Sequence, residues 1–170
     1  QDGRIGLWYL RKNGSHDCRP YLRVSADEGL HWSSPVCSIP APGYFVVNND
    51  RVVQLRNGRI VVPASLHRCK SGGDEKHEGN LDSKGLAIFF YSDDAGKTWR
   101  ESPTWWALPV YAASGLQEPG VLELRNGPLY AWARTSTGRQ WEMRSRDRGV
   151  TWSPPRPSRF HAPCAPLSMK

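Results

Sequence analysis

The sequence lacks the long apolar runs of membrane spans and the amphipathic patterns of long helices. No apolar stretch approaches the roughly 20 residues that a transmembrane helix requires, so no membrane span is expected. Tryptophan and proline are instead abundant, with 8 and 14 residues in a chain of 170. Short apolar segments separated by turn residues are typical of strands. The composition therefore predicts an all-β fold.

Metal-binding and redox motifs are also missing. The four cysteines, Cys18, Cys37, Cys69 and Cys164, show no C-x-x-C spacing, and no histidine pair lies near them at zinc-ligand spacing. We therefore expect no metal and no cofactor. A Cys18–Cys37 disulfide and buried free thiols are both consistent with the sequence, so the cysteines do not identify a cellular compartment.

The net charge of +7 is not concentrated in any one segment. The arginines are scattered, and no basic run reaches five residues. Nucleic-acid binding would call for a basic stripe or patch, so it is the least favoured function. A solvated surface, or a surface that attracts acidic ligands, is the better interpretation.

One octet occurs three times, at 25–32, 92–99 and 145–152. Its pattern is Ser-x-Asp-x-Gly-x-Thr-Trp, with His31 in place of the threonine in the first copy. The aspartate can accept hydrogen bonds from the turn's own amides, the glycine can take a positive φ, and the tryptophan ring can cover the turn. Asp27, Asp94 and Asp147 are therefore expected to shape turns rather than to perform chemistry. The recurrence indicates repeated architecture.

A second repeated signal is an Asn-Gly turn between two apolar runs, at Asn57-Gly58 and Asn126-Gly127. Each unit then reads as strand, Asn-Gly turn, strand, variable loop, strand, octet and strand. Strands are expected at 4–10, 20–25, 35–39, 51–55, 60–66, 86–91, 120–124, 129–133 and 140–144. Four antiparallel strands in each unit predict the blade of a β-propeller.

The blade units are expected at about 1–43, 44–111 and 112–160, with 161–170 leading into a further blade. A polar insertion at 70–84 interrupts the second unit. The first unit lacks its opening strand, and a closed propeller typically has about four to eight blades. The chain is therefore expected to be part of a longer protein.

Alternate turns of antiparallel strands lie at opposite ends of a sheet, so the octets and the Asn-Gly turns should share one end. The other end should collect 44–51, 67–84, 111–119 and 134–139. Glu118 precedes an inner strand there and Arg134 ends its neighbour, which suits binding of a small polar ligand. A salt bridge that caps the hairpin explains the same pair equally well.

These residues resemble those of a known family. The octets are similar to the Asp-boxes of sialidases. Segments 117–124 and 132–134, followed by an octet, resemble the catalytic-glutamate blade of exo-α-sialidases, and 49–64 resembles the preceding blade. The likeness covers Ile5 to Lys170. It implies a six-bladed propeller that releases terminal sialic acid with retention, using a tyrosine nucleophile activated by a glutamate, an acid/base aspartate and three carboxylate-binding arginines.

By this resemblance, Glu118 matches the glutamate that activates the tyrosine, and Arg134 matches one of the three arginines. Further contacts with the sugar are expected from Asn49, Asp50, Arg51 and Arg139. The implied ligand is a sialylated glycan or a related acidic sugar, and the implied location is secreted or periplasmic.

The sequence also departs from the family pattern. It contains no Arg-Ile-Pro motif with a following catalytic aspartate, and none of its six tyrosines has a matching context. The isolated chain is therefore expected to be inactive. Two alternatives remain: a non-catalytic Asp-box propeller that binds carbohydrate or protein, and a related glycosidase acting on another acidic or neutral sugar.

Overall fold

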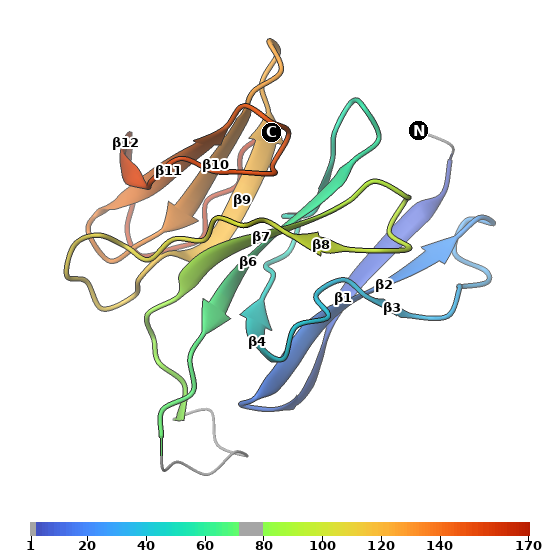
Figure 1. The fold of residues 1–170 in the computed structure, drawn as a ribbon, viewed down its shortest axis with the longest axis horizontal. Coiled ribbons are helices and arrows are strands. Elements are labelled where there is room, and N and C mark those ends of the chain that lie inside the picture. Colours follow the sequence, from blue (N-terminus) through green and yellow to red (C-terminus); the bar gives the residue numbers. More distant parts are fainter. Residues whose placement is uncertain (1–2, 72–79) are drawn as a thin grey trace.

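The computed structural model describes residues 3–71 and 80–170, and in these ranges the regular structure is entirely β. Two sheets pack against each other without closing into a ring (Figure 1). The all-β propeller prediction is confirmed, with about three blades in the chain. Most of the predicted insertion at 70–84 lies outside the described residues.

The strands follow the predicted order. The first blade contains β1 (Ile5–Gly14), β2 (Asp17–Ser25) and β3 (Val36–Cys37). The second contains β4 (Gly43–Val46), β5 (Val53–Gln54), β6 (Ile60–His67), β7 (Leu86–Ser92) and β8 (Arg100–Glu101). The third contains β9 (Gln117–Glu123), β10 (Leu129–Arg134), β11 (Arg139–Ser145) and β12 (Arg156–His161).

The inner strand of the second blade differs from the prediction. A single strand was expected at 51–55, but β4 and β5 both pair with β6 and are separated by a turn at Asn49 and Asp50. Asp50 has a φ of 60°, which a strand residue does not adopt, so the strand breaks there. β4 also pairs in parallel with β2, and this pairing joins the first two blades into one sheet.

The second blade is buried on both of its faces. Along β6 and β7, Val61 and Phe89 pack toward the third blade, whereas Val62 and Phe90 face Phe45 and the first blade. Successive side chains of a strand point to opposite faces, which explains this alternation. The two apolar clusters therefore hold the three blades together through side chains.

The octets form three similar turns. In the second copy, Asp94 accepts hydrogen bonds from the Thr98 amide (2.9 Å) and the Thr98 hydroxyl (2.6 Å). Ser92 Oγ donates to Asp94 and accepts from the amide of Gly96, whose φ is 85°. In the first copy, His31 Nδ1 takes the place of the threonine hydroxyl, 2.6 Å from the carboxylate of Asp27. Each turn thus satisfies its polar groups locally.

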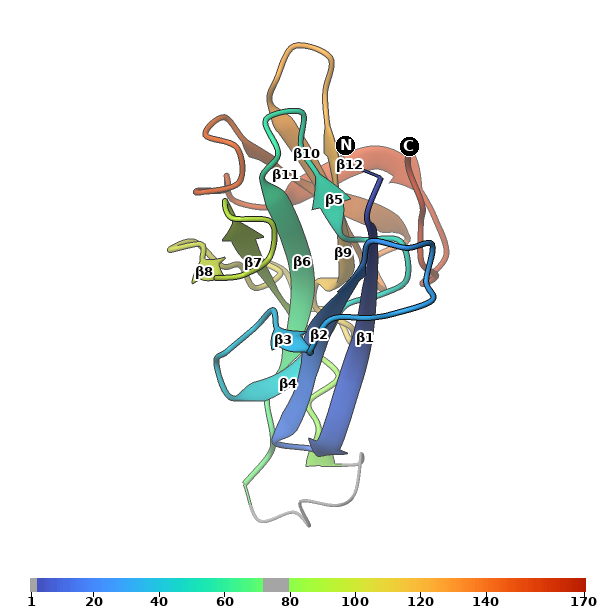
Figure 2. The ribbon, with the colours of Figure 1, turned by 90° about the vertical axis from the view of Figure 1, so that its right-hand side faces the viewer.

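The octets and the Asn-Gly turns lie at the same end of the blades, as their alternation predicts. Arg59 donates to both carboxylate oxygens of Asp93 (2.7 and 2.9 Å) and to the carbonyl of Arg148. Arg56 donates to the Leu124 carbonyl in the next blade (2.7 Å). Figure 2 shows the β5–β6 and β9–β10 turns projecting on the same side. We call this the octet end.

The four cysteines are free thiols, and Cys18 is the buried one. Of the two alternatives left by the sequence, a Cys18–Cys37 disulfide is therefore not the one observed. Within the described ranges, no helix has the length and hydropathy needed to cross a membrane.

Candidate functional site

Glu118 and Arg134 meet across the β9–β10 hairpin, at the end of the blades opposite to the octets. Arg134 Nε lies 2.8 Å from Glu118 Oε2, and Nη2 lies 3.1 Å from Oε1. The pair is thus bidentate, the geometry that gives guanidinium–carboxylate contacts their strength and direction. Arg134 Nη2 also donates to the side-chain oxygen of Gln117. The two charged side chains are about four-fifths buried, with 17% and 20% exposed.

The environment of Arg134 favours its charged form. Burial lowers the pKa of Arg134, but hydrogen bonds to Glu118 and Cys164 outweigh burial and raise the pKa above its usual value. The Cys164 sulfur lies 3.1 Å from Nη1, so the C-terminal segment covers one edge of the guanidinium.

Arg51 is the second cation beside Glu118, and it is only 4% exposed. Its guanidinium carbon lies 5.6 Å from the centre of the Trp132 ring, a cation–π contact. Burial lowers the pKa of Arg51, while the charges of Glu118 and Asp50 act in the opposite direction. Its Nε is buried without a hydrogen-bond partner among the described residues. A buried donor of this kind is costly unless something pairs with it.

Trp132 is fixed as the platform beneath Arg51. Its indole nitrogen donates to the Leu167 carbonyl (2.8 Å). Its ring also packs on Gly120, where an added Cβ would lie 2.3 Å from a ring carbon. A glycine is therefore required opposite this ring.

The remaining predicted contact residues are placed less centrally. Asn49 and Asp50 form the turn between β4 and β5 rather than beginning a strand. The Asp50 carboxylate pairs with Lys170 (2.9 Å) and is 58% exposed. Arg139 begins β11, and its side chain forms no hydrogen bond or ion pair within the described part of the chain. The charges of Asp50 and Glu118 both act on Arg51, so these residues belong to one charged region. Arg139 is not part of it.

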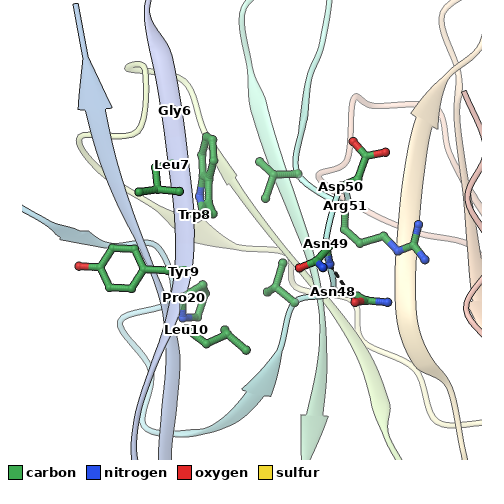
Figure 3. Close-up of a pocket in the computed structure, with 12 residues that line it drawn as sticks. Gly6, Leu7, Trp8, Tyr9, Leu10, Pro20, Asn48, Asn49, Asp50 and Arg51 are labelled. Atoms are coloured by element: carbon green, nitrogen blue, oxygen red, sulfur yellow. Dashed lines mark hydrogen bonds between the residues drawn. The ribbon is translucent and has the colours of Figure 1, made fainter. Parts of the chain in front are cut away.

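A cavity of about 610 Å³ lies on the other side of the Asn48–Val52 segment, against Trp8 and Leu10 of β1 (Figure 3). Figure 3 shows Arg51 extended away from β1, as its position over Trp132 requires. Apolar rings and side-chain amides line the two walls of this cavity. The Arg51 head group therefore belongs to the Glu118 side of the segment.

The sequence did not single out Gln117, Trp132 or Cys164 as site residues. Gln117 and Trp132 stand inside the motifs that carry the resemblance, so their position beside Glu118 and Arg134 was the available signal. Cys164 offered none, because it approaches Arg134 from 30 residues away. No cluster of three or more His, Cys, Asp or Glu side chains that could hold a metal ion occurs among residues 3–71 and 80–170.

Residues 1–169 match the family described as the BNR repeat-like domain. No curated protein sequence matches the chain at a significant level. Several solved structures share its fold. A *Dyadobacter fermentans* protein of unknown function aligns with a TM-score of 0.63 and 21% identity, covering 95% of this chain and 49% of its own.

Two sialidases align in the same way. A Hadza microbial sialidase has a TM-score of 0.63 and 20% identity, with 95% of this chain and 32% of its own covered. The *Trypanosoma rangeli* sialidase has a TM-score of 0.57 and 23% identity, with 88% and 25% covered. These identities establish likeness of fold, and the chain spans half or less of the length of each protein. The repeats, the blades and the match over nearly all residues agree: the chain belongs to the family of the BNR repeat-like domain.

Proposed function

We propose that this chain is the catalytic-glutamate portion of a glycoside hydrolase that releases terminal sialic acid, or a related acidic sugar, from glycoconjugates with retention. The observation that carries the proposal is the bidentate Glu118–Arg134 pair next to Arg51, whose buried Nε has no hydrogen-bond partner in the described ranges. We also propose that the protein acts outside the cytoplasm, where sialylated glycans are displayed.

Glu118 is the proposed proton acceptor. Sialic acid carries a carboxylate on its anomeric carbon, which would repel an anionic nucleophile, so a neutral phenol suits the reaction better. A carboxylate within hydrogen-bond reach can take the phenol proton as the tyrosine attacks. The largely buried position of Glu118, anchored by a guanidinium, fits that task. The tyrosine would come from outside the described blades.

The arginines are the proposed anion receptors. Arg134 presents a planar set of donors of which two already hold Glu118, and its Nη1 faces only Cys164. Arg51 adds a desolvated positive charge on the same side. A ligand carboxylate would accept a hydrogen bond from the unpaired Nε of Arg51. Binding would then remove the free-energy cost of the unsatisfied donor in the free protein.

The test is release of a fluorophore from a fluorogenic α-sialoside by the natural protein that contains this chain. We expect Glu118→Gln to lower kcat by about 10²–10⁴-fold, the usual range for losing a general base. Arg134→Lys keeps the charge but loses the bidentate geometry, and we expect it to raise KM.

Glu123→Gln is the matched control. Glu123 ends the same strand, β9, and pairs with Arg56 at the octet end. It should leave kcat unchanged. Equal losses of kcat in the Glu118 and Glu123 variants would contradict the catalytic role, because a loss of blade stability would then explain both. Sialoside binding without hydrolysis by the wild-type protein would favour a non-catalytic carbohydrate-binding propeller.

A further inference from the structure

We infer that Ser65, a residue of the second blade, is a positioning residue that sets the backbone of Glu118 in the third blade and thereby aims its carboxylate. The functional half of this inference rests on the function proposed above, whereas the structural half does not. Ser65 touches neither the Glu118 carboxylate nor Arg134, so its influence passes through the main chain.

Ser65 lies in the row of β6 side chains that face the third blade. The row continues from Val61 through Pro63, and the Ser65 residue is completely buried. A hydroxyl in such a place requires hydrogen-bond partners, because leaving it unpaired costs about 1–3 kcal/mol. Both partners come from the other blade.

The Ser65 hydroxyl makes two bonds to the segment that carries Glu118. Its oxygen accepts from the Glu118 amide at 3.0 Å and donates to the Leu116 carbonyl at 2.9 Å. It therefore spans the residue between them and clamps the chain where β9 begins.

The clamped residue has an unfavourable backbone. Glu118 has a φ of 48°, in the left-handed region, which costs a non-glycine residue roughly 1–2 kcal/mol. Pro119 follows it, and a residue before proline normally prefers an extended conformation. Such conformations persist where surrounding contacts enforce them and are concentrated at functional sites. Ser65, together with the register shift of the β9–β10 pairing between Gly120 and Gln117, supplies that enforcement.

Neighbouring contacts hold the same segment against the second blade. Gln117 donates to the Ser83 carbonyl (2.6 Å), and the Leu116 amide donates to the Gly85 carbonyl (2.8 Å). Gly115 approaches Gly85 so closely that an added Cβ would lie 2.5 Å from its carbonyl oxygen. These contacts hold the residues that precede Glu118, and the Ser65 hydroxyl holds the Glu118 amide itself.

The consequence for the site is geometric. The Cα–Cβ direction of Glu118 depends on its φ, so relaxation to an extended backbone would swing the carboxylate away from Arg134. A displacement of about 1 Å at a reacting group can cost on the order of 10²-fold in rate. The second blade would then set the catalytic geometry of the third.

The test is Ser65→Ala in the full chain, with Ser102→Ala as its matched control. Ser102 is also buried and also donates across to the third blade, to the Val150 carbonyl (2.7 Å), but at the octet end. The first readout is the φ of Glu118 from its amide–Hα scalar coupling, together with exchange of the Glu118 amide. We expect the coupling to change and the amide to exchange at least about tenfold faster in Ser65→Ala only.

The second readout is sialoside hydrolysis by the natural protein. We expect Ser65→Ala to lower kcat by about 10–100-fold with KM within about twofold of wild type, and Ser102→Ala to change neither. An unchanged Glu118 coupling in Ser65→Ala would overturn the inference, whether or not the protein is a sialidase. Equal kinetic losses in both serine variants would also overturn it. Absence of hydrolysis in the wild type would instead reject the proposed function, and the coupling would still decide the role of Ser65.

Discussion

The two ends of the blades differ in where their polar groups find hydrogen-bond partners. At the octet end, Asp94, Ser92 and Thr98 satisfy one another within a single turn. At the opposite end, the bonds of Ser65 cross between blades, and the Arg51 Nε has no partner among the described residues. This difference distinguishes the octet end from the end of the proposed site more clearly than residue type does, because both ends are rich in carboxylates and arginines.

The comparison also concerns backbone strain. Each octet contains one non-glycine residue with a positive φ, Glu28, Ala95 or Arg148, and each is followed by a glycine inside a self-contained turn. Glu118 adopts the same region directly before a proline and depends on another blade to hold it. A strained residue that its own turn holds in place serves the turn. A strained backbone held by contacts from another part of the molecule is typical of functional sites, which supports the role proposed for Glu118.

The largest effect should come from adding a methyl group where the blades touch. Gly115→Ala places a Cβ 2.5 Å from the Gly85 carbonyl oxygen at a φ of 62°, so backbone must move. We expect it to lower the free energy of unfolding by about 3 kcal/mol or more. Gly149→Ala, at the octet end, has a similar φ of 86° but meets only side-chain atoms at 3.4 Å or beyond. It should cost about 1–2 kcal/mol. Urea denaturation of both variants measures the difference, and equal losses would show that the blade contact is not tight.

A smaller change in the free energy of unfolding, of opposite sign, is expected on replacing Arg51. Arg51→Met removes a buried charge whose Nε has no hydrogen-bond partner among residues 3–71 and 80–170, and it keeps the apolar bulk over Trp132. We expect stability to stay level or to rise by up to about 1 kcal/mol, while affinity for a sialoside falls. Arg59→Met removes the fully partnered arginine of the octet end and should lose about 1–2 kcal/mol. Chemical denaturation and ligand titration test both. Destabilisation of the Arg51 variant as large as that of the Arg59 variant would contradict the functional interpretation of Arg51.

The smallest effect concerns acid stability, to which the octet end should contribute. Hydrogen bonds from Thr98 and Ser92 lower the pKa of Asp94 far below its ordinary 3.8. The folded state therefore binds fewer protons than the unfolded state, so this stabilisation is complete above about pH 4 and is lost as the pH falls through the folded pKa. Melting temperatures of wild type and Asp94→Asn between pH 6 and pH 2.5 should converge as the pH decreases. A constant gap would contradict a role for this carboxylate in acid stability.

The sequence was sufficient for the repeated and local parts of the fold. The octets and the Asn-Gly turns depend on residues a few positions apart, so their patterns predicted the blades and the end at which each turn lies. The Glu118–Arg134 pair could be predicted as well, because a hairpin of known turn fixes which residues meet at its open end.

The interactions between blades could not be predicted. The Asp50 break in the inner strand carries no glycine or proline to mark it. Arginine is normally exposed, so nothing local indicated that Arg51 would be buried against Trp132. The two bonds of Ser65 likewise join residues more than 50 positions apart. The resemblance had pointed to Arg51, but its burial against Trp132 and the bonds of Ser65 were accessible only from the folded chain.

The burial of β6 and β7 on both faces has a consequence for how the site could be switched off. Because the Glu118 amide is held by Ser65 across the interface between the second and third blades, a slight parting of these blades would free Glu118 from its strained backbone. Each blade would keep its own strand pairing during this opening, and the backbone bonds that would break are those joining Gly85 to Ser114 and Leu116. Under the proposed function, a small separation of these two blades would displace the catalytic carboxylate while the sheet of each blade stays intact.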